Sequence, residues 1–202
     1  MKTSLEILLI LSSYLLGSIP FGYIFTKKFA GINIREHGSG NIGSTNVRRF
    51  AGSKVALLTQ FCDMMKGLFP VAILLLIEYK RLYTFDEFFI YAVGLATILG
   101  HNFSVFLKFK GGKGVNTTLG ASLLLSPYSV FASVLVYFLV KWYSNYVSLG
   151  SICLGITLTL TGLIIHKSSY IIYYLLICSL FIVIMHIPNI KRLMNRTESR
   201  SE

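Results

Sequence analysis

Charged residues are scarce in this sequence, and acidic residues most of all. Only 13% of the 202 residues are charged, with 8 Asp and Glu against 19 Lys and Arg. Soluble domains contain about a quarter charged residues, so a chain that is 54% hydrophobic has too little polar surface to fold in water. We therefore expect the bilayer to be its solvent. The shortage of carboxylates also argues against a metal site, and no pattern indicates a cofactor.

Two further features are missing. The cysteines (Cys62, Cys153 and Cys178) all lie in apolar runs and are odd in number, so they predict neither a disulfide framework nor a metal site. No small-residue cleavage site follows the first apolar run, Leu5–Phe25. We therefore expect this run to stay in the protein as a membrane span and not to be removed as a signal peptide.

Long apolar runs are what the sequence does contain. A membrane-spanning helix needs about 20 mainly apolar residues, and the clear candidates are 5–26, 55–77, 88–107, 146–165 and 170–187. The run 115–141 is also apolar, but Ser126-Pro127 interrupts it near the middle. It is therefore either one kinked span or two short helices joined at the proline.

The distribution of Lys and Arg decides between these alternatives. The segments 27–54 and 108–114 and the C-terminal tail are rich in basic residues, which places them inside, whereas 78–87 belongs outside. An even number of crossings must then connect residues 114 and 191, which favours a hairpin over 115–141. We predict an all-α integral membrane protein that forms a single domain over 1–202. It would have seven transmembrane helices, two of them short and of about a dozen residues, with the N-terminus outside and the C-terminus in the cytoplasm.

The inner segment 38–49 reads Gly-Ser-Gly-Asn-Ile-Gly-Ser-Thr-Asn-Val-Arg-Arg. Such polar segments are usually plain turns, but glycines here permit backbone conformations in which successive N–H groups converge on an anion. The planar guanidinium of Arg49 suits a phosphate, whereas Arg48 is more typical of a topology-setting charge. We interpret the loop as an anion site, formed by Gly38, Ser39, Gly40, Gly43, Thr45, Asn46 and Arg49.

A second inner loop, Gly111-Gly112-Lys113-Gly114, precedes a helix that is expected to start near Val115. This order brings backbone N–H groups, the positive end of a helix and an ammonium group to one small volume. It is not a Walker A loop, because glycine and not Ser or Thr follows the lysine. Just before it, Lys108 and Lys110 alternate with Phe106 and Phe109, a pattern typical of chains at the membrane interface.

Isolated polar residues within or beside the spans are a third group of candidates. Asp63 and Lys66 stand three residues apart on one helix face, which favours a mutual ion pair that supports nearby loops over direct catalysis. His186 and Asn189 close the last span, where a histidine is either a helix cap or part of a site. Ser148 and Ser151 begin the preceding span, where hydroxyl groups also serve as caps.

Taken together, these motifs resemble the bacterial acyl-phosphate:glycerol-3-phosphate acyltransferase family over nearly the whole chain. The matching segments are Ser39-Gly40-Asn41 with Thr45-Asn46 and Arg49; Asp63 with Lys66-Gly67; Gly100-His101 with Phe106 to Val115; Val147-Ser148-Leu149 with Ser151-Ile152; and His186 with Asn189 to Leu193.

The resemblance implies an enzyme of phospholipid synthesis in the bacterial inner (plasma) membrane, with seven transmembrane helices and a cytoplasmic active site. Its reaction would move a fatty acyl group from a long-chain acyl phosphate to the sn-1 hydroxyl of glycerol 3-phosphate, releasing lysophosphatidic acid and phosphate. No cofactor, metal or nucleic acid would take part, and membrane lipid would be the only other partner.

Residue by residue, the resemblance implies three sets. The catalytic set is Ser39, Arg49, Lys113, His186 and Asn189; the substrate- and phosphate-binding set is Gly38, Gly40, Asn41, Thr45, Asn46, Gly111, Gly112, Gly114, Ser148 and Ser151; and the supporting set is Asp63, Lys66 and His101. We expect Arg49 and Lys113 to clamp phosphate, and amides around Gly112 to steady an oxyanion or the leaving phosphate. His186 and Asn189 would bind glycerol phosphate.

Four positions depart from the family pattern. The family usually has Pro at Ser104, Ala at Ser44 and Asn116, and Gly at Arg196. None of these changes removes a functional group, so they affect the expected local packing and, at Arg196, the expected geometry of the tail.

Two other functions fit the sequence less well. Acyltransferases that use acyl-CoA carry His-x-x-x-x-Asp, and no histidine in this chain has an Asp five residues later. A phosphate or organic-anion transporter would account for the basic inner loops, but it needs polar groups along both halves of its path. The outer halves of the predicted spans are almost purely apolar.

Overall fold

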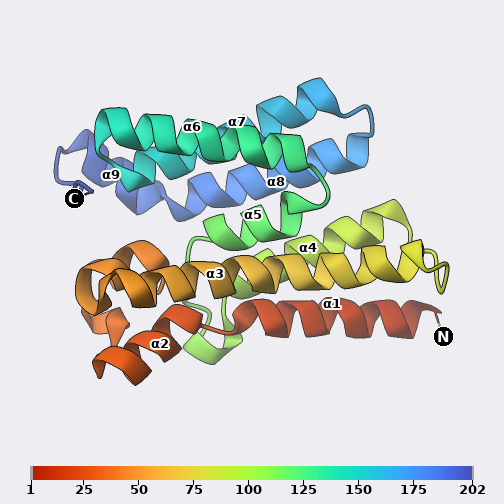
Figure 1. Ribbon diagram of the computed structural model, residues 1–202, viewed down its shortest axis with the longest axis horizontal. Coiled ribbons are helices and arrows are strands. Elements are labelled where there is room, and N and C mark those ends of the chain that lie inside the picture. Colours follow the sequence, from red (N-terminus) through yellow and green to blue (C-terminus); the bar gives the residue numbers. More distant parts are fainter. Residues whose placement is uncertain (1, 202) are drawn as a thin grey trace. The chain divides into compact units, whose positions relative to one another are not determined.

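The computed structural model describes residues 2–201, with side chains from residue 4 onward, and within that range it contains helices and no strands. The predicted all-α class is therefore confirmed. The helices are α1 (Lys2–Ser18), α2 (Phe21–Ala30), η1 (Ile34–Glu36), α3 (Ser44–Tyr79), α4 (Glu87–Asn102), η2 (Val105–Leu107), α5 (Val115–Leu123), α6 (Pro127–Ser144), α7 (Val147–Ile165), α8 (Ser169–Met185) and α9 (Ile187–Met194), as Figure 1 shows.

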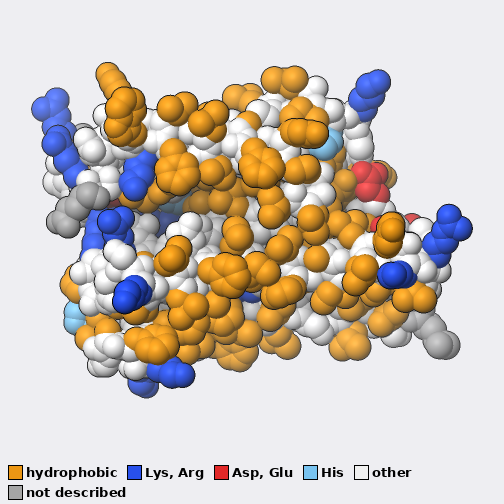
Figure 2. All heavy atoms as spheres, viewed as in Figure 1, with side chains coloured by type: hydrophobic (Ala, Val, Ile, Leu, Met, Phe, Trp, Pro, Cys, Tyr) orange, Lys and Arg blue, Asp and Glu red, His pale blue; other side chains and the backbone are white. Residues whose placement is uncertain are grey.

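The helices form two compact units, Met1–Leu124 and Leu125–Glu202. In the first unit α1 packs along α4, and α3 packs along α5 and α2. In the second unit α7 lies between α6 and α8 and contacts both, and α9 touches α7 and α8. Figure 2 shows apolar side chains along the sides of the helices and most Lys and Arg at the helix ends. Such a surface suits lipid, which solvates apolar side chains directly.

Several helices are long and apolar enough to cross a membrane. Four meet both criteria, over Ser4–Ala30, Ser44–Tyr79, Glu87–Leu107 and Val147–Ile165, and a fifth is added if the bent pair α8 and α9 is one span. All five correspond to clear candidates from the sequence, so the chain is a multi-pass membrane protein. The expected count of seven spans, and the expected sides of the two termini, stay predictions.

The apolar run 115–141 is broken where the sequence predicts it. Pro127 is the first residue of α6, a position where its missing N–H costs nothing, and Asn145 ends α6 in a left-handed conformation. The two halves are unequal, however. α5 has 9 residues and α6 has 18, so the expected length of about a dozen residues for each half is wrong, because α6 continues beyond 141 to this cap.

Helices of the first unit approach so closely that glycine is required at the contacts. A Cβ added to Gly120 of α5 would lie 1.9 Å from the Met64 carbonyl oxygen of α3, and one added to Gly67 of α3 would lie 2.2 Å from the Thr117 carbonyl oxygen of α5. Small residues are how membrane helices gain van der Waals contact, since lipid supplies no hydrophobic driving force between helices. The contact of α3 with α5 therefore depends on this pair of glycines.

We expect Gly120→Ala to lower the free energy of unfolding by about 1–3 kcal/mol, because the added methyl group overpacks a contact between two backbones. The measurement is thermal unfolding of the purified protein in detergent. Gly155→Ala is the matched control, since its Cβ would meet only the Ile182 side chain at 3.2 Å. Equal melting temperatures for the two variants would show that the α3–α5 contact is less close than described.

Candidate functional site

The loop before α3 is shaped by one buried amide. Asn46 lies in the first turn of α3 and is 3% exposed. Its Nδ2 donates hydrogen bonds to the carbonyl oxygens of His37 (3.0 Å) and Asn41 (2.9 Å), and its Oδ1 accepts one from the Ser39 N–H (3.3 Å). Asn46, expected to contact substrate, therefore acts on the backbone of the loop that carries Ser39.

Glycine geometry and apolar anchors complete this loop. Gly38 and Gly40 have φ angles of 58° and 67°, a region that other residues enter only with strain. The Asn41 Oδ1 accepts a hydrogen bond from the Gly43 N–H at 2.8 Å, just before α3 begins. A buried apolar cluster holds this loop in place, and it consists of Ile34, Ile42, Val47, Ala56 and Leu107.

The charged and hydroxyl groups of this segment face outward. Ser39, Thr45 and Arg49 are exposed, so they are accessible to a ligand. Gly52 interrupts α3 with a φ of 81° and a ψ of 171°. Arg49 therefore lies on a short first segment of α3, ahead of the apolar part of the helix.

The glycine loop before α5 packs against the end of α4. The N–H groups of Gly111 and Gly112 donate to the carbonyl oxygens of Asn102 (3.0 Å) and His101 (2.9 Å). A Cβ on Gly112 would lie 2.1 Å from the His101 Nε2. These two amides therefore build the loop. Of the amides around Gly112 that were expected to steady an oxyanion or the leaving phosphate, these two are already bonded to α4. The amides of the first turn of α5, after Gly114, have no intrahelical acceptor.

The N-terminal ends of α3 and α5 meet. The Asn116 Nδ2, in the first turn of α5, donates to the Ser44 Oγ, the first residue of α3, at 3.5 Å. Each helix follows a glycine-containing loop, and each presents the positive end of its dipole there. With Ser39 and Lys113 on these loops and Arg49 on the second turn of α3, this part of the first unit is the candidate anion site.

A buried ion pair supports the site from the middle of the unit. The Lys66 Nζ lies 2.9 Å from the Asp63 Oδ1, and both residues are 2% exposed, so the predicted ion pair is confirmed. The Lys66 Nζ also donates to the Ile19 carbonyl oxygen (2.8 Å), at the break between α1 and α2. On its other side Asp63 lies 3.5 Å from the His101 Nδ1. His101 is thus held between Asp63 and the glycine loop, which fits the supporting role expected of all three residues.

The second unit brings the remaining candidates together at the bend between α8 and α9. The two helices meet at His186 with an angle of 53°. The His186 Nδ1 makes a 2.7 Å hydrogen bond to the Ile182 carbonyl oxygen, so Nδ1 carries a proton there. His186 is 2% exposed and Asn189 is 5% exposed. The two sequence interpretations of His186, a cap or part of a site, are therefore compatible.

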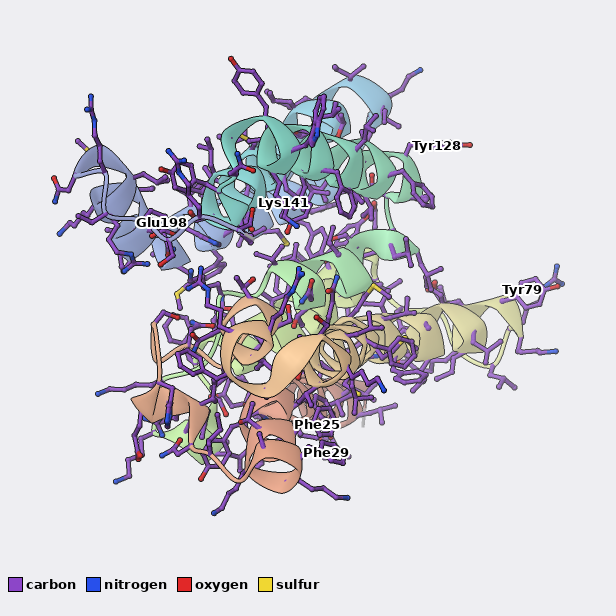
Figure 3. All side chains as sticks on the ribbon, turned by 60° about the vertical axis from the view of Figure 1, so that its left-hand side comes forward. Phe25, Phe29, Tyr79, Tyr128, Lys141 and Glu198 are labelled. Atoms are coloured by element: carbon purple, nitrogen blue, oxygen red, sulfur yellow. The ribbon has the colours of Figure 1, made fainter. Side chains whose placement is uncertain are left out.

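Glu198 joins this group, and no sequence pattern singled it out. The carboxylate, labelled in Figure 3, accepts hydrogen bonds from the Asn189 Nδ2 and the Arg192 Nε, both at 2.6 Å. Burial raises the pKa of Glu198, but these bonds, with the Ser148 hydroxyl and the charge of Arg192, outweigh it and hold the pKa below the ordinary 4.5. Glu198 is therefore an anion at neutral pH.

The two candidate serines of α7 differ in their partners. The Ser151 Oγ donates to the Val147 carbonyl oxygen of its own helix at 2.9 Å. The Ser148 Oγ is buried and makes no such bond, but it lies close enough to Glu198 to help lower the pKa of that carboxyl group. The tail that carries Glu198 is fixed by hydrogen bonds from the Thr197 N–H to the Arg192 carbonyl oxygen (2.8 Å) and from the Ser201 N–H to the Asn145 carbonyl oxygen (2.7 Å).

Comparison with known proteins gives a consistent result. The profile of the family described as glycerol-3-phosphate acyltransferase matches residues 7–196. The chain is 42% identical over 193 residues to the glycerol-3-phosphate acyltransferase of Clostridium acetobutylicum, covering 95% of this chain and 98% of that protein. It is 43% identical over 196 residues to that of Geotalea daltonii, with 96% of each chain covered.

Solved structures agree with the sequence comparison. The chain is similar to the crystal structure of PlsY, an integral membrane glycerol 3-phosphate acyltransferase, in its glycerol 3-phosphate form. The TM-score is 0.88 at 36% identity, with 98% of this chain and 96% of that chain covered. The lysophosphatidic acid form of PlsY gives a TM-score of 0.86 at 35% identity, with 96% and 94% covered.

We expect the stabilising effect of Glu198 to depend on pH. A carboxylate with a lowered pKa contributes fully to the free energy of unfolding above its ordinary pKa, 4.5, and the contribution is lost as the pH falls through the lowered value. Glu198→Gln should therefore melt below the wild type at pH 7, and the difference should shrink as the pH falls below 4.5. Thermal unfolding across this range is the measurement, with Glu36→Gln as an exposed control. A difference that stays constant with pH would contradict the charged network.

Proposed function

The chain belongs to the glycerol-3-phosphate acyltransferase family, and from this premise we propose that it transfers a fatty acyl group from acyl phosphate to the sn-1 hydroxyl of glycerol 3-phosphate. The products would be lysophosphatidic acid and inorganic phosphate. One observation carries the proposal. The first turns of α3 and α5 meet, and there the Asn116 side chain hydrogen-bonds to that of Ser44. Two positive helix ends, with the exposed Arg49 and the half-buried Lys113 beside them, suit a reaction in which both substrates carry phosphate.

The physical difficulty of the reaction is to hold two phosphates of like charge while a hydroxyl group meets a carbonyl carbon. Orientation of the two reactants contributes up to about 7–11 kcal/mol to lowering the barrier. In the proposal, Arg49 and Lys113 clamp phosphate, and the first-turn amides of α5 take the role once expected of Gly112. Ser39 donates a hydrogen bond from the loop that Asn46 holds.

His186 and Asn189 are proposed to bind the glycerol phosphate, with Ser148 beside Asn189. We propose that the substrate's own phosphate accepts the hydroxyl proton. His186 is the second candidate, because its Nδ1 is used by the Ile182 carbonyl oxygen, which leaves Nε2 as the basic nitrogen of the neutral ring. A covalent acyl-serine at Ser39 is not favoured, since no histidine is seen to hydrogen-bond its hydroxyl among the contacts described.

We further propose that the chain acts as a single domain in a bacterial inner (plasma) membrane, with its active site toward the cytoplasm. The basic loops around Arg49 and Lys113 support this orientation by the positive-inside rule. The seven-span topology with an outer N-terminus follows from the same rule and is tested by labelling engineered cysteines from each side of the membrane.

The acyl donor is tested with purified protein in lipid. We expect release of phosphate from a long-chain acyl phosphate that depends on glycerol 3-phosphate, with lysophosphatidic acid formed and no reaction with acyl-CoA in a parallel sample. Activity with acyl-CoA alone would overturn the proposed donor but keep the family. No comparison supports the transporter alternative. Uptake of phosphate into sealed vesicles, without acyl transfer, would be the evidence in its favour.

We expect Lys113→Ala to lower kcat/KM by at least about 100-fold while the protein stays folded, because a charge that meets developing negative charge is lost near the positive end of α5. Lys167→Ala, which removes an exposed charge from the second unit, should leave the rate within about twofold. Steady-state kinetics and thermal unfolding are measured on both. Wild-type activity of Lys113→Ala would remove this lysine from the mechanism.

A further inference from the structure

The break between α1 and α2 creates an apolar groove on the first unit. Pro20 lies at the break between the two helices, which Figure 1 shows, and the 3₁₀ turn η2 lines the groove with Phe106 and Leu107. The groove has a volume of about 380 Å³ and is lined by Ile19, Pro20, Tyr23, Ile24, Phe106 and Leu107. Its size and apolar lining match those of sites that hold small apolar ligands.

Hydrogen bonds hold the η2 wall in place. The Ser104 Oγ donates to the Ser18 carbonyl oxygen at 2.5 Å, and the Tyr14 hydroxyl donates to the Phe103 carbonyl oxygen at 2.7 Å. Leu107 is 5% exposed and belongs to the buried cluster under the loop before α3. The groove is therefore formed before any ligand binds.

Both walls end in a lysine. On the α2 wall the Lys27 Nζ lies 5.9 Å from the centre of the Tyr23 ring, which lines the groove. On the η2 wall Lys108 directly follows the lining residue Leu107, and both lysines are exposed. Each of the two segments that line the groove thus carries an exposed lysine, an arrangement complementary to an amphiphile with an anionic head.

The η2 wall also places aromatic side chains at the surface. Phe106 and Phe109 are 59% and 61% exposed, and on α2 Phe29 is 56% exposed, with its ring 6.0 Å from that of Phe25 (Figure 3). Lys108 and Phe109 both have left-handed backbone conformations, with φ angles of 55° and 60°. Such conformations persist where the surrounding structure fixes them, often at ligand contacts. Aromatic rings beside lysines are typical of the lipid headgroup region.

We propose that this groove binds one anionic phospholipid of the surrounding bilayer, with an acyl chain against the apolar lining and the headgroup at Lys27 and Lys108. The charge of the two walls favours this occupant over a neutral lipid, because each basic residue near a membrane surface strengthens binding to anionic lipid. Lysine side chains also reach from an apolar surface to a headgroup with their charged ends.

Because the groove is next to the segment that leads to Lys113, a bound lipid should affect that segment. The chain runs from Lys108 through Lys110 into Gly111, and the Lys110 N–H is bonded to the Leu107 carbonyl oxygen at 3.2 Å. A lipid held at Lys108 stabilises the segment that leads to Lys113. We therefore expect anionic lipid to raise acyl transfer. This consequence rests on the proposed function, whereas the binding itself does not.

Binding is tested by native mass spectrometry of the purified protein in detergent, titrated with phosphatidylglycerol or with phosphatidylcholine of the same chains. The wild type should retain one phosphatidylglycerol more tightly than phosphatidylcholine. In Lys27→Gln/Lys108→Gln the affinity for phosphatidylglycerol should fall by about tenfold or more. Ile24→Trp, which fills the groove at a residue that is 40% exposed, should lose the lipid without any change of charge.

The matched control is Lys80→Gln/Arg81→Gln. It removes the same number of positive charges just after the C-terminal end of α3. There the Lys80 Nζ also lies 5.9 Å from the centre of a tyrosine ring, that of Tyr79. It should retain the lipid as the wild type does, and thermal unfolding shows that each variant is folded. Three results would overturn the proposal. The two double variants could lose the phospholipid equally, or the wild type could retain phosphatidylcholine as well as phosphatidylglycerol. A long-chain acyl phosphate could also displace the phospholipid one for one. Acyl transfer is assayed separately, so that its failure is distinguishable from failure of binding.

Discussion

The buried pair of Asp63 and Lys66 is the interaction on which the first unit depends. A charge inside a membrane-spanning segment needs a partner, and removing one member of such a pair costs about 3–5 kcal/mol. Lys66 also donates to the Ile19 carbonyl oxygen, which lies beside Pro20 at the break between α1 and α2. Through Asp63 and His101 the same pair reaches the glycine loop. One ion pair thus joins the α1–α2 break to the loop that carries Lys113.

Much of this arrangement could be predicted from the sequence, because its causes are local. Apolar length identified the clear spans, Ser126-Pro127 marked the break before α6, and the three-residue spacing of Asp63 and Lys66 predicted their pair. Each of these signals depends on the period of a helix or on the backbone of a proline. The sequence also predicts anion sites at the two glycine loops, from their glycines and the basic residues beside them, and this stays a prediction.

What the sequence did not show depends on contacts between distant segments. Glu198 lies in a short polar tail, and only the fold brings its carboxylate to Asn189 and Ser148. The amides of Gly111 and Gly112 were expected to face a ligand, but they bond to the end of α4, because a loop this close to a helix must satisfy that helix's last carbonyl groups first. The length of α6 was underestimated, since its end is set by the left-handed cap at Asn145 and not by loss of hydropathy.

The four departures from the family pattern now have physical explanations. Ser44 and Asn116, each usually alanine, hydrogen-bond to each other, so the two changes form one added contact between the helix ends at the candidate site. Ser104, usually proline, bonds to the Ser18 carbonyl oxygen and fixes η2 by a hydrogen bond where proline would fix it by its ring. Arg196 has a φ of 57°, the conformation for which glycine is favoured. Arg196 therefore makes the backbone turn that returns Glu198 to Asn189 in a conformation that glycine enters without strain.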